Sequence, residues 1–204
     1  MPDLAPPDPT EPARPELWLV RHGETEWARL GRHTGRTDVP LTDTGREQAR
    51  ALGRRLAGHS FTLVMTSPLL RAAATAALAG FGDVAIVNPD LQEWDYGALE
   101  GRLTTEIRDD YPGWSIWTGP WPQGETADQV ATRADRVIAR AREGPGDVLV
   151  FAHGHLLRVL AARWLALPPA SGGLFALTTA TLSILGWERE TAVIETWNEA
   201  CHLR

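Results

Sequence analysis

Four short apolar runs, separated by stretches with helical spacing, constrain the fold of this 204-residue chain more than any other feature. The runs cover residues 17–20, 61–66, 84–87 and 148–152. Uninterrupted apolar strands are typical of parallel sheets buried on both faces, and parallel strands require long, usually helical, crossovers. We therefore predict an α/β fold with a mainly parallel central sheet covered by helices.

The intervals between the runs carry start signals for helices. Thr42 suits an N-cap and predicts a helix over 42–58. Ser67 and Pro68 predict the cap and first position of a second helix that runs through Ala79. Residues 90–123 are rich in Trp, Gly and Pro and predict an excursion over the active face, with one short helical piece near 104–111. One further helix is predicted to begin at residue 125, and another to follow the fourth apolar run and extend through residue 164. Residues 181–187 and 192–197 predict an antiparallel hairpin.

Composition narrows the classes of function. All 20 basic residues are arginine, so this chain has no lysine for Schiff-base or P-loop chemistry. The net charge of -6 disfavours a general role in binding nucleic acid or an acidic membrane. The single cysteine, Cys201, allows no internal disulfide, and no apolar run is long enough to span a bilayer. The start also lacks the order of a secretion signal, so we expect a cytoplasmic protein.

The start of the chain differs in composition from the rest. Residues 1–15 hold six prolines and several acidic residues with little to bury, which predicts a disordered arm. Residues 16–204 are long enough for one domain with its own core. We therefore predict a single domain preceded by the arm.

Reactive side chains follow the predicted strands. Arg21 and His22 follow the first run, Arg71 lies one helical turn after the second, and His153 follows the fourth. Because the carboxyl ends of parallel strands meet at one edge of a sheet, we expect these four side chains to lie together there.

These residue types suit phosphoryl transfer. An arginine in the first turn of a helix opposes the helix dipole, so Arg71 indicates a bound anion, and with Arg21 it offers guanidinium forks that match phosphate oxygens. An unprotonated ring nitrogen of His22 can accept a phosphoryl group, and His153 can donate to its oxygens in the transition state. Taken singly, each residue also fits a surface arginine or a core or metal-site histidine.

A leaving alkoxide needs a proton, and Glu93, with Trp94 and Tyr96 close after it in the sequence, is our first choice of donor. Asp95 and Glu24 are the alternatives. His153 and His155 resemble a metal pair, but the sequence has no third ligand at a suitable spacing. We therefore predict a site with neither metal nor another cofactor.

Five motifs in chain order resemble the histidine phosphatase superfamily, the phosphoglycerate mutase-like family. They are Arg21-His22-Gly23-Glu24-Thr25, Pro40-Leu41-Thr42-Asp43-Thr44-Gly45, Ser67-Pro68-Leu69-Leu70-Arg71-Ala72, Glu93 before Tyr96-Gly97, and His153-Gly154. The resemblance implies a three-layer α/β/α sandwich and a metal-independent site. It assigns His22 as nucleophile, Glu93 as proton donor, Arg21, Arg71 and His153 as the phosphate pocket, and Thr25, Thr34 and Gly154 as further phosphate or substrate contacts.

The sequence departs from the mutases of this family. Ala28 stands where many members have asparagine, and the chain lacks the insert whose basic residues bind the substrate carboxylate. The segments 33–38, 93–101, 114–117 and 152–155 are more similar to the branch with sedoheptulose bisphosphatase and broad-specificity acid phosphatases.

We therefore predict a phosphatase that hydrolyses small phosphorylated metabolites, such as sugar phosphates or bisphosphates, through a phosphohistidine. A phosphoglycerate mutase is the alternative, and a non-catalytic phosphate-binding protein is the third choice.

Two further questions stay open. Trp94, Trp114, Trp117 and Trp121 form either a wall over the substrate or packing for the excursion, and an exposed sheet edge is compatible with a homodimer.

Overall fold

The structure is a computed structural model that describes residues 14–204. The predicted disordered arm lies outside the described residues except for Arg14 and Pro15.

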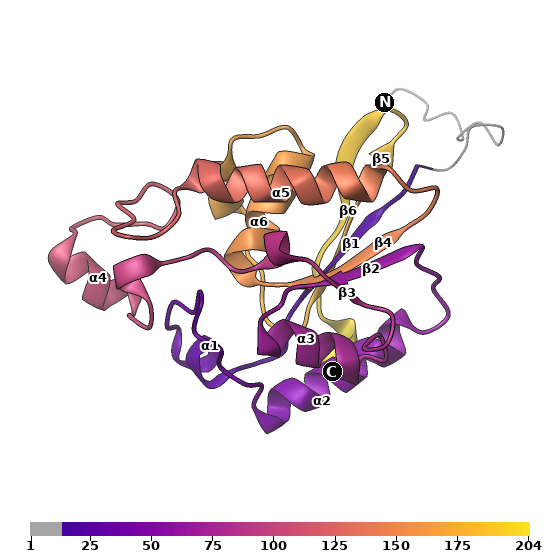
Figure 1. Ribbon diagram of the computed structural model, residues 1–204, viewed down its shortest axis with the longest axis horizontal. Coiled ribbons are helices and arrows are strands. Elements are labelled where there is room, and N and C mark those ends of the chain that lie inside the picture. The colour runs from indigo at the N-terminus through magenta and orange to yellow at the C-terminus, as the bar shows by residue number, and fades with distance from the viewer. Residues whose placement is uncertain (1–13) are drawn as a thin grey trace.

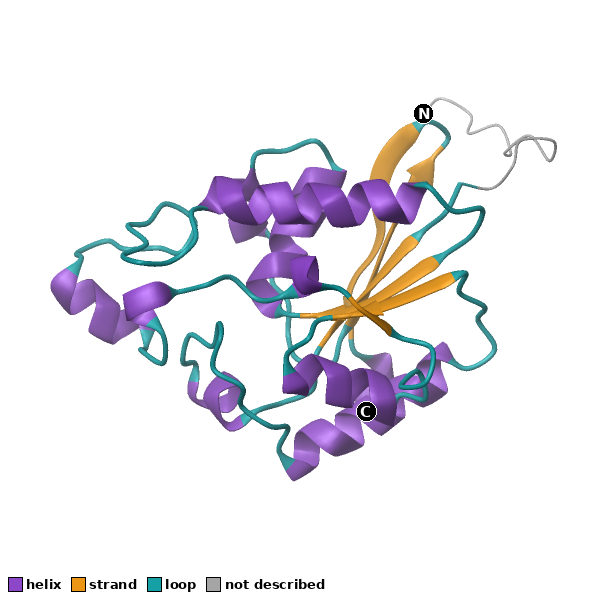
Figure 2. Ribbon diagram, in the orientation of Figure 1, coloured by secondary structure: helices purple, strands orange, loops and turns teal. Residues whose placement is uncertain are grey.

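A six-stranded sheet in the order β3-β2-β4-β1-β5-β6 forms the centre of the molecule (Figure 2). The first four strands of the chain pair in parallel, whereas β5 pairs antiparallel with both β1 and β6. The predicted parallel sheet and the C-terminal hairpin are therefore confirmed. The strands are β1 Leu17–Arg21, β2 Leu63–Thr66, β3 Ile86–Val87, β4 Val148–Ala152, β5 Leu182–Glu188 and β6 Thr191–Glu199.

Helices cover both faces of this sheet, with α2 and α3 on one side and α5 and α6 on the other (Figure 1). The α-helices are α1 Glu26–Leu30, α2 Asp43–Leu56, α3 Leu70–Leu78, α4 Thr104–Asp110, α5 Ala127–Arg142 and α6 Gly154–Trp164. Short 3-10 helices are η1 Pro89–Leu91, η2 Gly97–Leu99, η3 Pro169–Leu174 and η4 Cys201–Leu203. The three-layer architecture matches the prediction.

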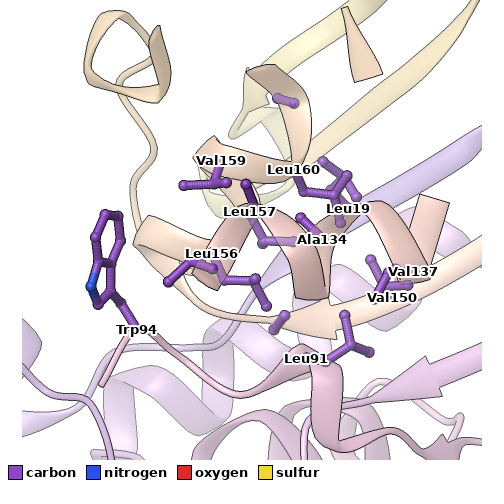
Figure 3. Packing of buried hydrophobic residues seen from close by; sticks show 14 of the residues in the cluster. Leu19, Leu91, Trp94, Ala134, Val137, Val150, Leu156, Leu157, Val159 and Leu160 are labelled. Carbon is purple, nitrogen blue, oxygen red and sulfur yellow. The ribbon is translucent and has the colours of Figure 1, made fainter. Parts of the chain in front are cut away.

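The strands feed two separate cores because alternate side chains point to opposite faces. Leu17 and Leu19 of β1 join the core under α5 and α6, whereas Trp18 and Val20 join the core under α2 and α3. Figure 3 shows the larger core, where Leu19 and Val150 lie near Ala134 and Val137 of α5 and Leu157 of α6. Both faces of β1, β2 and β4 are thus largely buried, which explains their uninterrupted apolar sequence, whereas Ile86 and Val87 of the edge strand β3 are exposed.

Local capping confirms one predicted helix start and corrects another. The Thr42 hydroxyl accepts a hydrogen bond from the Gly45 amide at 3.0 Å, so it caps α2 as predicted. The predicted cap at Ser67 is wrong, because α3 begins at Leu70 with Leu69 as its N-cap. The Ser67 amide still donates to the Phe151 carbonyl at 2.9 Å, so the chain remains bound to the sheet edge where the helix was expected to begin.

The Trp-rich excursion is packed onto the core. Trp94 and Trp114 are buried, and their indole N–H groups donate to the carbonyls of Glu125 and Pro120. Trp121 donates to the Ile116 carbonyl at 2.7 Å. These three tryptophans therefore hold the excursion in place, whereas the Trp117 ring packs against His155 and Arg158.

Strand register delivers the reactive residues to one edge. Arg21 of β1 pairs with Ala152 of β4, and Thr66 of β2 pairs with Phe151. The next residues, His22, Ser67 and His153, therefore leave the sheet side by side. Among residues 14–204, no helix has the length and apolar character needed to cross a bilayer.

Candidate active site

A cavity of about 190 Å³ opens at this edge of the sheet. Its size suits a small metabolite, since sites for drug-sized molecules occupy roughly 300–1,000 Å³. Its lining includes five residues predicted from the sequence: Arg21, His22, Thr34, Glu93 and Gly154. The other lining residues are Ala28, Gly31, Arg32, His33, Tyr96, His155, Arg158 and Leu177.

His22 is held as a neutral imidazole with a fixed tautomer. Its Nδ1 lies 2.8 Å from the Gly23 carbonyl, which can only accept, so Nδ1 carries the proton. Burial, followed by the charges of Arg71 and Arg21, holds the pKa of His22 well below its ordinary value. The unprotonated Nε2 is therefore the free nucleophilic nitrogen.

The loop after His22 is fixed by two close contacts. The Gly23 amide donates to the Thr75 hydroxyl of α3 at 3.0 Å, and that hydroxyl donates to the Arg71 carbonyl at 2.7 Å. A Cβ atom on Gly23 would lie 2.4 Å from the Gly45 carbonyl oxygen, so the start of α2 packs directly on this loop. The backbone that sets the His22 tautomer is thus anchored to two helices.

Arg21 presents an unsatisfied donor at the cavity. One end of its guanidinium is tied down, because Nη1 donates to the Leu177 carbonyl at 2.5 Å. Its buried Nε is without a hydrogen-bond partner among residues 14–204. Leaving a buried donor unpaired costs about 1–3 kcal/mol, and an oxyanion bound here would remove that cost. The geometry fits a phosphate oxygen next to His22.

Arg71 and His153 are fully buried and lie beside the cavity lining rather than within it. Arg71 Nε donates to His153 Nδ1 at 3.1 Å, which leaves the proton of the neutral ring on Nε2, 2.7 Å from Ser67 Oγ. The His153 ring centroid lies 5.2 Å from that of His22. Both ring nitrogens of His153 are therefore occupied, and donation to a phosphate would require one of them to exchange partners.

Arg71 also holds in place the loop at residues 34–37, which contributes Thr34 to the cavity lining. Its Nη1 and Nη2 donate to the carbonyls of Thr37, Thr34 and Gly35 at 2.9–3.0 Å. Burial lowers the pKa of Arg71, and the nearby Glu93 carboxylate opposes this effect. Arg71 thus links the anion-binding edge to the loop at residues 34–37.

Among the three candidate proton donors, only Glu93 lines the cavity. Its carboxylate accepts from the amides of Trp94 and Leu156 at 2.9 Å and of His155 at 3.0 Å. Asp95 instead accepts from Arg36 and Gly97, and Glu24 accepts from the Thr42 hydroxyl. Position therefore favours Glu93.

Two of the three further substrate contacts that the resemblance implies line the cavity, and the third does not. Thr34 and Gly154 line the cavity, and a Cβ atom on Gly154 would lie 3.3 Å from the Arg21 guanidinium carbon. Thr25 is buried away from the lining, and its hydroxyl accepts from the Ala28 amide and caps α1. Substrate contact by Thr25 remains a prediction without support from this geometry.

Sequence reasoning did not assign the other side of the cavity. We call Arg21, His22, Arg71 and His153 the phosphate end, and Arg32, His33, Tyr96, His155 and Arg158 the leaving-group end. The Tyr96 hydroxyl lies 2.6 Å from His155 Nδ1, and burial raises the pKa of Tyr96 well above its ordinary value. Burial also lowers the pKa of His33 to about 4. The segments 33–38, 93–101 and 152–155 contain His33, Tyr96 and His155, but their resemblance to the phosphatase branch assigned these three residues no role, and no motif pointed to Arg32 or Arg158.

Among residues 14–204, no three His, Cys, Asp or Glu side chains lie close enough together to hold a metal ion.

Comparison with known proteins places the chain in a family. Residues 17–200 match the histidine phosphatase superfamily (branch 1). An acid phosphatase of Mycobacterium tuberculosis is 46% identical over 87% of this chain and 91% of that protein. A sedoheptulose 1,7-bisphosphatase of Saccharomyces cerevisiae is 38% identical over 75% of this chain and 68% of that protein.

The fold agrees with this assignment. The solved structure of open reading frame Rv3214 from Mycobacterium tuberculosis superposes with a TM-score of 0.86 at 44% identity, covering 90% of this chain and 97% of that one. The chain therefore belongs to branch 1 of the histidine phosphatase superfamily.

Proposed function

We propose that this phosphatase hydrolyses phosphate monoesters of small metabolites without a metal, by way of a phosphohistidine on His22. The observation that carries the proposal is the pairing of a neutral His22, whose Nε2 is free, with an unsatisfied buried donor on Arg21. A phosphate there would satisfy the donor and place phosphorus beside the nucleophile.

In the first step, His22 Nε2 attacks phosphorus and the bond from phosphorus to the ester oxygen breaks. Glu93, in its protonated form, gives its proton to the leaving oxygen. In the second step, Glu93 removes a proton from a water molecule, whose oxygen attacks phosphorus and breaks the P–N bond. Inorganic phosphate leaves, and His22 and Glu93 return to their starting states.

The charged groups of the phosphate end support both steps. Arg21 lies at the cavity, and Arg71 lies against His153. Two guanidinium charges compensate a phosphate dianion, and their fixed positions cost little reorganisation as charge spreads in the transition state. His153 keeps its assigned role as a further donor if its Nε2–H exchanges Ser67 for a phosphate oxygen.

The relatives support small phosphorylated substrates, since one is named an acid phosphatase and another a sedoheptulose 1,7-bisphosphatase. Phosphoglycerate mutase activity is the alternative, and a non-catalytic phosphate-binding protein is the third choice. The missing basic insert and Ala28 at the cavity wall favour hydrolysis over a mutase. Cytoplasmic location and homodimer formation remain predictions.

The test is phosphate release by the wild type and His22→Ala in chelator-treated buffer. The panel comprises sugar phosphates, phosphoglycerates and an aryl phosphate. We expect release to survive the chelator and to disappear in His22→Ala. The matched control is His59→Ala, because His59 pairs with Asp147 at the opposite edge of the sheet and lies outside the cavity.

Three results would count against the proposal. Release that His22→Ala retains would remove the phosphohistidine. Activity that the chelator abolishes would indicate a metal-dependent site. Transfer of phosphate between phosphoglycerates without release would favour the mutase.

A further inference from the structure

The leaving-group end holds more positive charge than a single phosphate needs. Arg32 and Arg158 line the cavity together with Arg21, and Glu93 is the only carboxylate among the lining residues. Arg21 and Arg71 already match the charge of one phosphate dianion. Two guanidinium groups therefore face the cavity with no anion assigned to them.

Arg158 is held in place without a counter-ion. Its Nε donates to the Gly172 carbonyl at 3.0 Å and its Nη2 to the Gly173 carbonyl at 3.3 Å. Its guanidinium lies over the Trp117 ring, 4.5 Å from the centroid. Among residues 14–204, no carboxylate forms a salt bridge with it. A half-buried cation held this way is costly unless an anion binds it.

The position of Arg158 separates it from the phosphate end. Gly154 packs against the Arg21 guanidinium, and Arg158 lies four residues later on α6. Four residues of helix advance about 6 Å along the axis. Arg158 is thus one turn away from the bound phosphate and on the same wall of the cavity.

Arg32 lines the cavity from the loop that follows α1. Its Nη1 donates to the Gly101 carbonyl at 2.6 Å, which fixes the guanidinium beside the excursion. The nearest carboxylate, Glu106 Oε2, is 4.0 Å away and accepts from the Leu103 amide at 2.8 Å. Arg32 therefore has little charge compensation from the described residues.

We propose that Arg32 and Arg158 form a second anion-binding subsite, which selects substrates that carry a second phosphate group on the leaving alcohol. The proposal rests on the proposed function, because the scissile phosphate must occupy the phosphate end. Two guanidinium groups match the charge of a phosphate dianion, and each is anchored through a backbone carbonyl, so little side-chain freedom is lost on binding. A carboxylate would occupy the same subsite with one charge fewer.

The test compares substrates that differ in the second anion, namely a sugar bisphosphate, the matching sugar monophosphate and a phosphorylated carboxylic acid. The probes are fructose 1,6-bisphosphate, fructose 6-phosphate and 3-phosphoglycerate, with kcat and KM measured for the wild type, Arg158→Gln and Arg32→Gln. Each charge-assisted contact contributes about 1.5–3 kcal/mol, or roughly ten- to hundredfold in affinity. We expect each variant to lower the ratio of kcat/KM for the bisphosphate over the monophosphate by at least tenfold, mainly through KM. The matched control, Arg163→Gln, removes an α6 arginine that pairs with Asp135 outside the cavity, and should keep the wild-type ratio.

The outcomes distinguish the subsite from the proposed function. Hydrolysis that depends on His22 but with an unchanged ratio in both variants would overturn the subsite and leave the proposed function standing. If both substitutions lower kcat/KM for 3-phosphoglycerate relative to fructose 6-phosphate but leave the ratio for the bisphosphate unchanged, the subsite binds a carboxylate and not a second phosphate. Calorimetric binding of the bisphosphate to His22→Ala, with and without Arg158→Gln, tests the subsite without turnover. Equal affinities there would also overturn it.

Discussion

The two ends of the cavity are built in different ways. At the phosphate end, Arg21, His22 and His153 stand at the last position of a parallel strand or directly after it, and are held by backbone groups or by each other. At the leaving-group end, the side chains come from the loop after α1, the Trp-rich excursion and the first two turns of α6. Sheet register positions the first end, whereas packing of loops against the start of α6 positions the second.

This difference indicates a division of roles. An end fixed by the sheet suits a step that is the same for every substrate, namely attack on phosphorus. An end formed by loops can vary without disturbing the sheet, so it suits recognition of the leaving group. Substitutions at the first end are therefore expected to affect all substrates alike, and those at the second to affect them unequally.

The largest effect is expected for Arg21→Gln. Removing a fixed donor to a developing oxyanion typically lowers turnover by about 10²–10³-fold, and here a charge is lost as well. We expect kcat/KM to fall about thousandfold for aryl and sugar phosphates alike. The control is Arg36→Gln, an exposed arginine that pairs with Asp95 outside the cavity lining. A loss that depends strongly on the leaving group would contradict the division between the two ends.

Glu93→Gln should give the next largest effect, and it tests the border between the ends. An alkoxide leaves poorly without a proton, whereas a nitrophenolate leaves readily, so only the first needs the acid. We expect phosphoenzyme formation to slow by about 10²-fold or more with a sugar phosphate and by about threefold or less with an aryl phosphate. Rapid-quench measurement of the phosphoenzyme checks this. Equal losses on both substrates would remove Glu93 as the proton donor.

The sequence was sufficient to predict that the residues of the phosphate end lie together at one edge of the sheet. Apolar strands that stop at Arg21 or directly before His153 place those residues at one sheet edge whatever the loops do. Arg71 was correctly placed in the first turn of its helix, although α3 begins later than Ser67 suggested. Its side chain binds the carbonyls of residues 34–37 and His153, and spacing along the sequence cannot predict such long-range contacts.

The leaving-group end was missed for a physical reason. Arg32 and Arg158 are two arginines among 20, and nothing in their neighbours distinguishes a cavity-lining arginine from a surface one. The Arg32 side chain is held by the Gly101 carbonyl, and that of Arg158, although it lies on α6, is held by the carbonyls of Gly172 and Gly173 and by the Trp117 ring. Periodicity along the sequence carries no information about such long-range contacts.

Both ends bury neutral histidines, and the cost should appear as acid sensitivity of the fold. Burial holds the pKa values of His22, His153 and His155 well below 6.5 and that of His33 at about 4. As the pH falls below about 6.5, the unfolded chain takes up protons that the native state does not, so the free energy of unfolding decreases. Each such histidine contributes about 1.4 kcal/mol per pH unit.

Urea unfolding between pH 7 and pH 4 measures this loss. His33→Gln should reduce the slope of the unfolding free energy against pH by about 1.4 kcal/mol per unit between pH 6.5 and 4, because it removes one histidine of the leaving-group end. A slope equal to that of the wild type would show that His33 titrates alike in both states, and would leave the acid sensitivity to the phosphate end.

The smallest effect is expected for Thr75→Val, which disturbs the phosphate end without touching a lining residue. The Thr75 hydroxyl accepts from the Gly23 amide, and the Gly23 carbonyl fixes the His22 tautomer. Valine keeps the shape but leaves that amide unpaired, at a cost of about 1–3 kcal/mol. We expect kcat to fall about tenfold with KM nearly constant, and by the same factor for every substrate, since the loosened loop carries the nucleophile. Thr75→Ser keeps the hydroxyl and should restore kcat. A loss in Thr75→Ser as large as in Thr75→Val would assign the effect to methyl packing and break the link between Thr75 and His22.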